Sequence, residues 1–283
     1  MTPRGSDKRP SSAAAGVSGS IQAVTDLLHV HRYGPTRPPQ ILAVHGLTGH
    51  GRRWQTLATR HLPEFAIVAP DLIGHGRSSW AAPWSIDANV GALAGLLDAD
   101  AGGPVVVVGH SFGGAVALSL AAARPDLVAA LVLLDPAVGL DGGWMLDIAN
   151  DMFASPDYTN RAEARSEKAN GSWGDVDPDE LDRELDEHLI EVPGGRVGWR
   201  ISIPAMMSYW SELARPIRLP RKEIPVTLAR ASKTDPPYVT DDLHTGLAER
   251  SDFTLMEFDC DHMVPLARPA DTAAVIRKQL ERG

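Results

Sequence analysis

The sequence contains a single cysteine, Cys260, among its 283 residues. One thiol cannot form an internal disulfide, so nothing in the chain calls for an oxidising compartment, and we expect a structural thiol. Basic residues are also few, 27 against 36 acidic ones, which gives a net charge of -9. Nucleic acids and anionic membranes attract basic surfaces, so neither is expected as the main partner.

Long apolar runs are missing as well. No stretch reaches the roughly 18 to 20 consecutive apolar residues that a membrane-spanning helix needs, and the start, MTPRGSDKRP, lacks the apolar segment of a signal peptide. The sequence also lacks H-E-x-x-H and paired-cysteine spacings, so we predict no metal site and no cofactor. We therefore expect a cytoplasmic protein whose main partner is a small-molecule substrate. The oligomeric state cannot be read from the sequence.

The strongest pattern that is present lies between residues 104 and 123. Valines fill residues 105–108, which predicts a strand buried on both faces of a parallel sheet, and an alanine-rich helical pattern follows. Gly-His-Ser-Phe-Gly, a G-x-S-x-G motif, stands at the junction. A turn this tight needs glycine at 109 and 113 and holds the central residue at strained φ and ψ with its Oγ projecting. Ser111 is therefore the predicted nucleophile.

An earlier loop, residues 45–49, reads His-Gly-Leu-Thr-Gly and follows an apolar strand pattern. Its glycines let the backbone turn beneath the serine, so that the amides of Leu47 and Phe112 can face one point as an oxyanion hole. Another loop carries Asp71, His75 and Arg77, which we expect to be scaffold residues held by local hydrogen bonds.

Strand and helix patterns alternate along most of the chain. Strands are predicted at residues 65–69, 129–134, 225–229 and 253–258, with edge strands between 23 and 33, and helices at 52–61, 86–97, 241–250 and 268–281. This alternation indicates an α/β fold with a mainly parallel central sheet and helices on both faces. Ligands of such sheets bind beyond the carboxyl ends of the strands.

The alternation stops between residues 137 and 218, where tryptophans and methionines are spread through helical patterns. We interpret residues 137–218 as a helical cap inserted into a core formed by residues 21–136 and 219–283. One amphipathic helix is expected over residues 179–192, with its acidic side chains on a solvated face. Residues 1–20 have the composition of a disordered tail.

These motifs, followed by a late Asp235 and His262, make the chain resemble the α/β-hydrolase fold family from about residue 28 to 280. The resemblance implies the order nucleophile, acid, base, which Ser111, Asp235 and His262 satisfy. Asp235 follows the penultimate predicted strand, where the family usually places its acid. Asp135, at the end of the strand after the serine, is the alternative, because some relatives take the acid from there.

The predicted chemistry follows from the weakness of a serine hydroxyl as a nucleophile. His262 would remove the serine proton, and a carboxylate would hold the imidazole in the required tautomer. We expect hydrolysis of a carboxylic ester, or of a thioester, through an acyl-enzyme on Ser111. The resemblance leaves other chemistry on the same residues as alternatives, namely acyltransferase, lactonase, carbon-carbon bond hydrolase and perhydrolase activity, as well as a non-catalytic ligand receptor.

Overall fold

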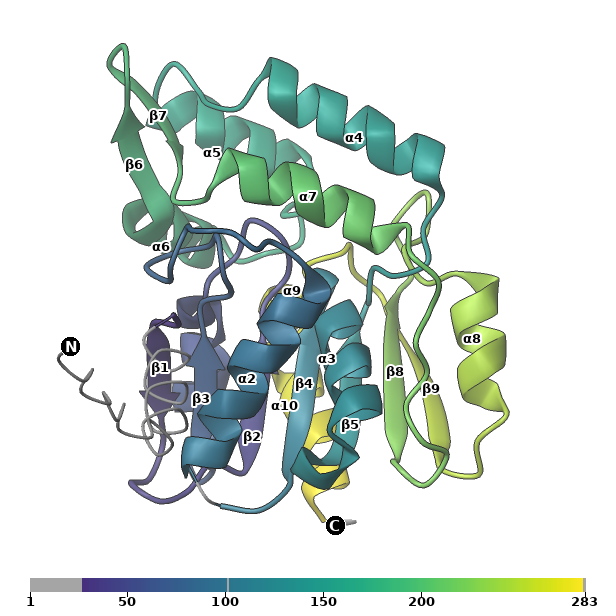
Figure 1. Cartoon of the computed structure of the whole chain (residues 1–283). Coiled ribbons are helices and arrows are strands. Elements are labelled where there is room, and N and C mark those ends of the chain that lie inside the picture. Colours follow the sequence, from purple (N-terminus) through teal and green to yellow (C-terminus); the bar gives the residue numbers. More distant parts are fainter. Residues whose placement is uncertain (1–26, 101, 282–283) are drawn as a thin grey trace, which may run out of the picture.

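One sheet of seven strands organises the computed structural model, which describes residues 27–100 and 102–281 (Figure 1). The spatial order of the strands is β1-β3-β2-β4-β5-β8-β9. Neighbouring strands are parallel except at one edge, where β1 runs antiparallel to β3. The strands are β1 (Val30–Tyr33), β2 (Ile41–Val44), β3 (Ile67–Pro70), β4 (Val105–His110), β5 (Val128–Leu134), β8 (Val226–Ala231) and β9 (Phe253–Phe258). The predicted mainly parallel sheet is confirmed.

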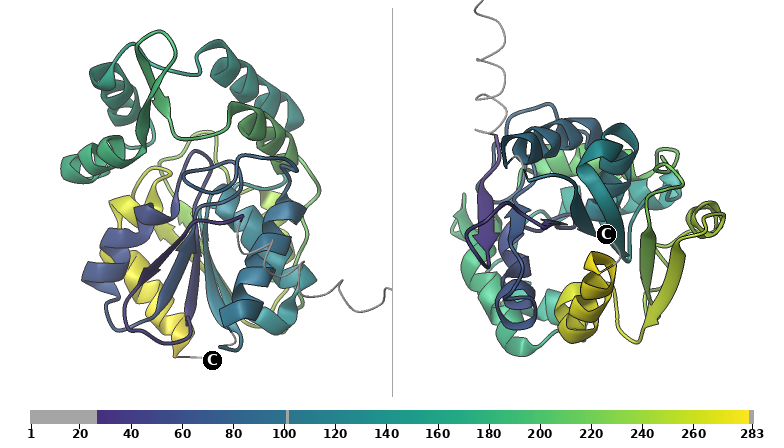
Figure 2. Two further views of the ribbon diagram at one scale, coloured as in Figure 1. Left: turned by 60° about the vertical axis from the view of Figure 1, so that its left-hand side comes forward. Right: turned by 90° about the horizontal axis from the view of Figure 1, so that it is seen from below.

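The central strands are rich in valine because both faces of the sheet are covered. Every residue of β2, β3 and β4 is buried. Successive residues of β4 point to opposite faces, so Val107 belongs to one apolar layer and Val108 to the other. Helices therefore flank the sheet on both sides, as the two further views show (Figure 2).

The helices divide between these two layers. The layer around Val107 contains apolar residues of α2, α3 and α8, and the layer around Val108 contains those of η2 and α10. The helical segments of the core are η1 (Gly51–Trp54), η2 (Leu57–His61), α2 (Ile86–Asp100), α3 (Phe112–Ala123), η3 (Pro125–Leu127), α8 (Asp241–Ala248), α9 (Val264–Ala267) and α10 (Pro269–Leu280).

Residues 137–218, called the insertion below, leave the sheet after β5 and return before β8. The insertion stands above the sheet in Figure 1 and contains α4 (Gly142–Ala154), α5 (Arg161–Asn170), α6 (Pro178–His188), β6 (Leu189–Val192), β7 (Arg196–Trp199) and α7 (Ile203–Leu213). Most of the insertion is helical, and β6 and β7 add an antiparallel hairpin that the sequence analysis did not predict. The helix predicted for residues 179–192 accordingly ends at His188.

Tyr209 of α7 attaches the insertion to the core. Its ring is fully buried, 4.7 Å from the Phe112 ring, and its hydroxyl donates to the Ile73 carbonyl at 2.9 Å. The same hydroxyl accepts from the Asn89 side-chain amide at 2.9 Å. Because both polar partners belong to the core, α7 is held in a defined position beside the residue that follows Ser111.

The other predicted elements match the structure to within a few residues. The predicted strand over residues 253–258 is confirmed as β9, and the helix predicted from residue 86 continues to Asp100. The segment predicted as a helix over residues 52–61 is helical throughout, and it begins as a 3-10 turn, η1, and ends as a π-helical turn, η2. The predicted tail, residues 1–20, and the first residues of the predicted edge strands lie outside the described residues.

The loop after β3 is a scaffold, as predicted. The Asp71 carboxylate accepts from the Gly51 amide at 2.7 Å and from the Arg77 amide at 2.8 Å. The His75 ring is buried, and its Nδ1 lies 3.1 Å from the Ile73 carbonyl oxygen. These side chains hold backbone turns together and leave little capacity for chemistry.

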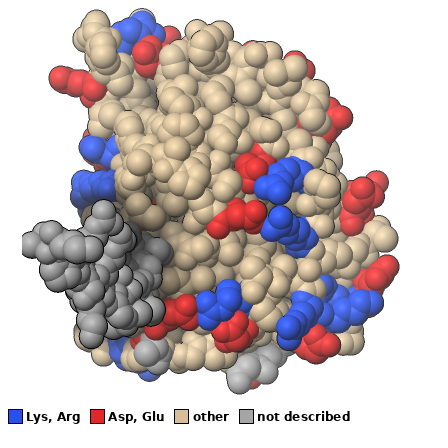
Figure 3. All heavy atoms as spheres, viewed as in Figure 1, with Lys and Arg blue, Asp and Glu red and all other residues tan. Residues whose placement is uncertain are grey.

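The outer surface fits the low basic content of the sequence. On the face drawn in Figure 3, basic and acidic side chains lie next to one another and form no large basic area. Within the described part of the chain, no helix is both long enough and apolar enough to cross a lipid bilayer.

Candidate active site

Ser111 lies in the sharp turn between β4 and α3. Its φ of 54° and ψ of -123° fall in a region that residues with a side chain rarely occupy. The turn has no room for a side chain at Gly109 or Gly113. A Cβ on Gly109 would lie 2.4 Å from the Gly113 carbonyl oxygen, and a Cβ on Gly113 would lie 2.3 Å from the Val44 carbonyl oxygen. The predicted strained elbow is present.

The sheet register places Asp135 beside this elbow. His110 of β4 and Leu134 of β5 are register partners, so Ser111 and Asp135 leave neighbouring parallel strands at the same level. Asp135 is buried and also has a positive φ, 43°. Its Oδ1 accepts from the Ala231 amide at 3.1 Å, which fixes the orientation of the carboxylate.

His262 lies against Asp135 and not against Asp235. Its Nδ1 is 2.6 Å from Asp135 Oδ2. Asp235 is exposed to solvent. It follows Ser232 and Lys233, whose amides donate to the carbonyls of Phe258 in β9 and of Cys260 in the next loop. Because Asp135 already lies at Nδ1 of the ring and the Asp235 side chain is exposed, the preference for Asp235 is corrected to Asp135 as the carboxylate beside His262.

His110, the residue before Ser111, holds the loop that carries His262. Its Nε2 lies 2.8 Å from the His262 carbonyl oxygen, and the two rings are 4.9 Å apart. A carbonyl can only accept, so the proton is on Nε2. Burial and then the nearby His262 lower the pKa of His110 well below its usual range, which keeps it neutral. His110 belongs to the G-x-S-x-G motif, but nothing in the motif itself indicated this role.

Tyr238 is the other neighbour of His262 that sequence reasoning missed. Its ring lies 4.1 Å from the His262 ring and 5.2 Å from the Trp144 ring of α4. Burial raises the pKa of its phenol, which therefore stays protonated at neutral pH. The loop predicted to supply the acid contributes this aromatic wall, and no sequence pattern distinguished Tyr238 from an ordinary loop residue.

The loop of residues 45–49 packs directly on the elbow. A Cβ on Gly46 would lie 2.9 Å from Ser111 Cβ, so only glycine permits this approach. Gly49 donates to the Gly46 carbonyl at 3.1 Å, which closes a turn with Leu47 and Thr48 at its centre. Among the described residues, the amides of Leu47 and Phe112 donate no hydrogen bond.

His45 fixes the start of this turn. Its Nε2 accepts from the Leu72 amide at 2.9 Å, and its Nδ1 lies 2.8 Å from the Gly46 carbonyl oxygen. Burial, followed by the nearby His75, lowers the pKa of His45 well below its usual range. The ring is therefore neutral with its proton on Nδ1, and it joins the turn to the scaffold loop after β3.

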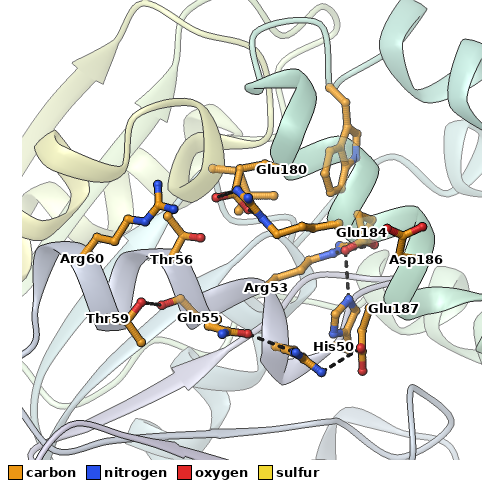
Figure 4. Close-up of a pocket in the computed structure, with 14 residues that line it drawn as sticks. His50, Arg53, Gln55, Thr56, Thr59, Arg60, Glu180, Glu184, Asp186 and Glu187 are labelled. Carbon is orange, nitrogen blue, oxygen red and sulfur yellow. Dashed lines mark hydrogen bonds and ion pairs between the residues drawn. The ribbon is translucent and has the colours of Figure 1, made fainter.

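A cavity of about 310 Å³ lies between the η1–η2 segment and α6 (Figure 4). Many of its lining residues carry charged side chains, among them Arg53, Arg60, Glu180 and Glu184. Ser111 and His262 are not among its lining residues, so we do not assign this cavity as the substrate pocket of the candidate active site.

One group of side chains has the composition of a cation site. The possible ligand atoms of His29, His31 and Asp71 lie within 4.8 Å of one another. Asp71 is nevertheless already bonded to two backbone amides, as described above. We therefore treat this group as part of the scaffold and assign no metal to it.

Comparison with known proteins shows which family the chain resembles. Residues 41–275 match the model of the "Alpha/beta hydrolase family". "Lipase LipV" of Mycobacterium tuberculosis is 63% identical over 255 residues, which cover 89% of this chain and 97% of that protein. "Esterase Rv0045c" of the same organism is 38% identical over 127 residues, 43% of this chain and 42% of that protein.

A solved structure supports the fold. E-2-(Acetamidomethylene)succinate hydrolase superposes with a TM-score of 0.78 at 22% identity, covering 90% of this chain and 95% of that chain. At this identity the likeness concerns the fold alone. The sheet, the strained serine turn and the family match over most of the core agree with one another, and the chain belongs to the alpha/beta hydrolase family.

Proposed function

We propose that the protein hydrolyses a small-molecule carboxylic ester through an acyl-enzyme on Ser111, with His262 as the general base and Asp135 as its carboxylate partner. Ester hydrolysis follows from the family and from relatives named lipase and esterase. The contact of 2.6 Å between His262 Nδ1 and Asp135, beside the strained Ser111, is the observation that supports these residue roles.

The proposed reaction begins with attack of Ser111 Oγ on the ester carbonyl carbon. The serine proton moves to Nε2 of His262, while the buried Asp135 stabilises the imidazolium through Nδ1. The carbonyl oxygen becomes an oxyanion that accepts from the amides of Leu47 and Phe112. Collapse of this intermediate expels the alcohol, which takes the proton from His262.

Water completes the proposed cycle. His262 takes a proton from a water molecule, the resulting hydroxide attacks the acyl carbon, and Ser111 is released with its proton restored. The second product is a carboxylic acid. The insertion, residues 137–218, is the proposed cap over this site. Its Trp144 packs on Tyr238 of the loop after β8, and the Tyr238 ring lies beside His262. The cytoplasmic location stays a prediction from the sequence.

The test is hydrolysis of p-nitrophenyl esters of increasing acyl length, together with labelling by a fluorophosphonate. Ser111→Ala should abolish both turnover and the mass increase caused by the label. Ser119→Ala is the matched control, because Ser119 is equally buried, at 7% exposed, and lies in α3, the helix that begins directly after Ser111. Turnover that persists in Ser111→Ala would contradict the proposal. A thioester, a lactone and an added alcohol acceptor would identify the alternative reactions.

A further inference from the structure

A buried charged cluster joins α6 of the insertion to the segment that follows the 45–49 loop (Figure 4). Glu184 of α6 is 5% exposed, although the sequence pattern placed it on a solvated face. Its Oε1 accepts from Arg53 Nε at 3.0 Å, and its Oε2 lies 2.9 Å from His50 Nε2. The prediction of a uniformly solvated acidic face was wrong at this position.

The charges in this cluster are compensated. Burial alone raises the pKa of Glu184, but the Arg53 guanidinium and then the His50 ring lower it well below its usual range. Glu184 is therefore ionised at neutral pH. A buried ion pair gains little net stability, because desolvation offsets the attraction between its charges.

Arg53 and His188 both bind the carbonyl oxygen of Thr48. Arg53 donates to it from Nη2 at 3.0 Å, and His188 Nε2 lies 3.1 Å from it. Burial, followed by His50, lowers the pKa of His188 well below its usual range, so the ring is neutral. Since a carbonyl only accepts, Nε2 carries the ring proton. One donor comes from the core and the other from the end of α6.

Thr48 needs such support because its φ is 57°. Among the central residues of the turn closed by Gly46 and Gly49, this is the position where glycine is usual, and a residue with a side chain there is strained. The hydrogen bonds that the charged Arg53 and the neutral His188 donate to the Thr48 carbonyl oppose that strain. The adjoining residue of the same turn is Leu47.

We propose that Glu184, Arg53 and His188 are positioning residues that set the Leu47 amide for the oxyanion. Glu184 orients Arg53, and Arg53 and His188 fix the Thr48 carbonyl, which sets the turn that contains the Leu47 amide. Because Glu184 and His188 belong to α6, docking of the insertion completes the oxyanion hole. This inference rests on the proposed function.

The experiment compares Glu184→Gln and His188→Gln with Glu187→Gln. Glu187 lies on the same helix and pairs with the exposed Arg52 and Arg77, so its variant controls for loss of an acidic side chain on α6. A misplaced oxyanion donor acts on the transition state more than on bound substrate. We expect kcat for a p-nitrophenyl ester to fall about 10- to 100-fold in the first two variants, with KM within about threefold. Glu187→Gln should match the parent.

A second readout separates positioning from general weakening of the fold. The affinity of a boronic acid, which forms a tetrahedral adduct with the serine, should fall by the same factor as kcat/KM. Unchanged kcat or unchanged boronate affinity in both folded variants would overturn the inference, and so would failure of both variants to fold, because the cluster would then be structural. Absence of ester turnover in the parent would instead overturn the proposed function.

Discussion

Asp135 Oδ2 lies 2.6 Å from His262 Nδ1, while the Asp235 carboxylate is exposed to solvent beyond the end of β8. In the sheet, β8 lies between β5 and β9, but all three strands are parallel, so the loops that follow β5 and β9 leave the sheet at the same edge. This pairing decides which carboxylate the proposed chemistry uses.

We predict that Asp135→Asn lowers kcat/KM for an ester by about 10³- to 10⁴-fold, because an amide beside Nδ1 favours the wrong imidazole tautomer. Asp235→Asn should stay within about threefold of the parent, since its side chain is exposed. Steady-state hydrolysis of a p-nitrophenyl ester measures both. The opposite ranking of the two variants would restore Asp235 as the acid.

The glycine at position 113 is required by space. A Cβ there would meet the Val44 and His45 carbonyl oxygens at 2.3 and 2.6 Å, and both atoms belong to the backbone beneath the elbow. We predict that Gly113→Ala lowers the free energy of unfolding by about 1 to 3 kcal/mol or prevents folding. Urea denaturation monitored by tryptophan fluorescence is the measurement.

Gly91→Ala is the control for this change. Gly91 lies in α2, is exposed, and has nothing within 4 Å of the added Cβ. Alanine has the higher helix propensity, so the free energy of unfolding should rise by about 0.5 to 1 kcal/mol. Equal destabilisation by the two substitutions would show that crowding at the elbow is not the cause.

The sequence was sufficient where the signal is local. The valine strand 105–108, the glycines at 109 and 113 and the 45–49 loop each carry their own steric or periodic reason, and the structure has all of them. Asp135 and Asp235 both follow predicted strands, so the choice depended on where a loop turns after β8, which the sequence does not encode locally. Tyr238 gave no pattern at all, because its role comes from its distance to His262.

The acidic pattern of α6 led to a wrong prediction for Glu184, which is buried, for a related reason. Periodicity identifies the stripe of Leu181 and Leu185, and both are buried. Glu184 lies next to that stripe and is buried too, because Arg53 on a distant segment supplies its counter-charge. Because Arg53 is 131 residues from Glu184 in the sequence, the local pattern of α6 cannot reveal this partner.

The hydroxyl of Tyr209 should matter for stability. Tyr209→Phe would leave the buried Asn89 amide and the Ile73 carbonyl each without this partner. We predict a loss of about 1 to 3 kcal/mol in the free energy of unfolding. Tyr33→Phe is the control, because the Tyr33 hydroxyl lies 3.5 Å from the Gly51 carbonyl, too far for a strong bond. Similar effects in urea denaturation of both variants would contradict the assignment.

Lys168 of α5 makes the stability depend on pH. Its Nζ lies 4.2 Å from the Trp199 ring centroid and 4.7 Å from that of Trp173. Burial, followed by the positive charge of Arg53, lowers the pKa of Lys168 to about 7. In the unfolded chain a lysine titrates at about 10.4. Between these values the unfolded state binds a proton that the folded state lacks, so this group makes the free energy of unfolding rise with pH.

Lys168→Met keeps the apolar stem and removes the amine. The difference in free energy of unfolding, parent minus variant, should therefore increase from pH 7 to pH 10, which urea denaturation at several pH values measures. Lys222→Met is the control, because the Lys222 side chain is 70% exposed. A parent-minus-variant difference that stays constant over this range would mean that the ammonium of Lys168 is as well solvated in the folded protein as in the unfolded chain. Burial of the amine and the charge of Arg53, which lies over the same Trp173 ring, argue against that outcome.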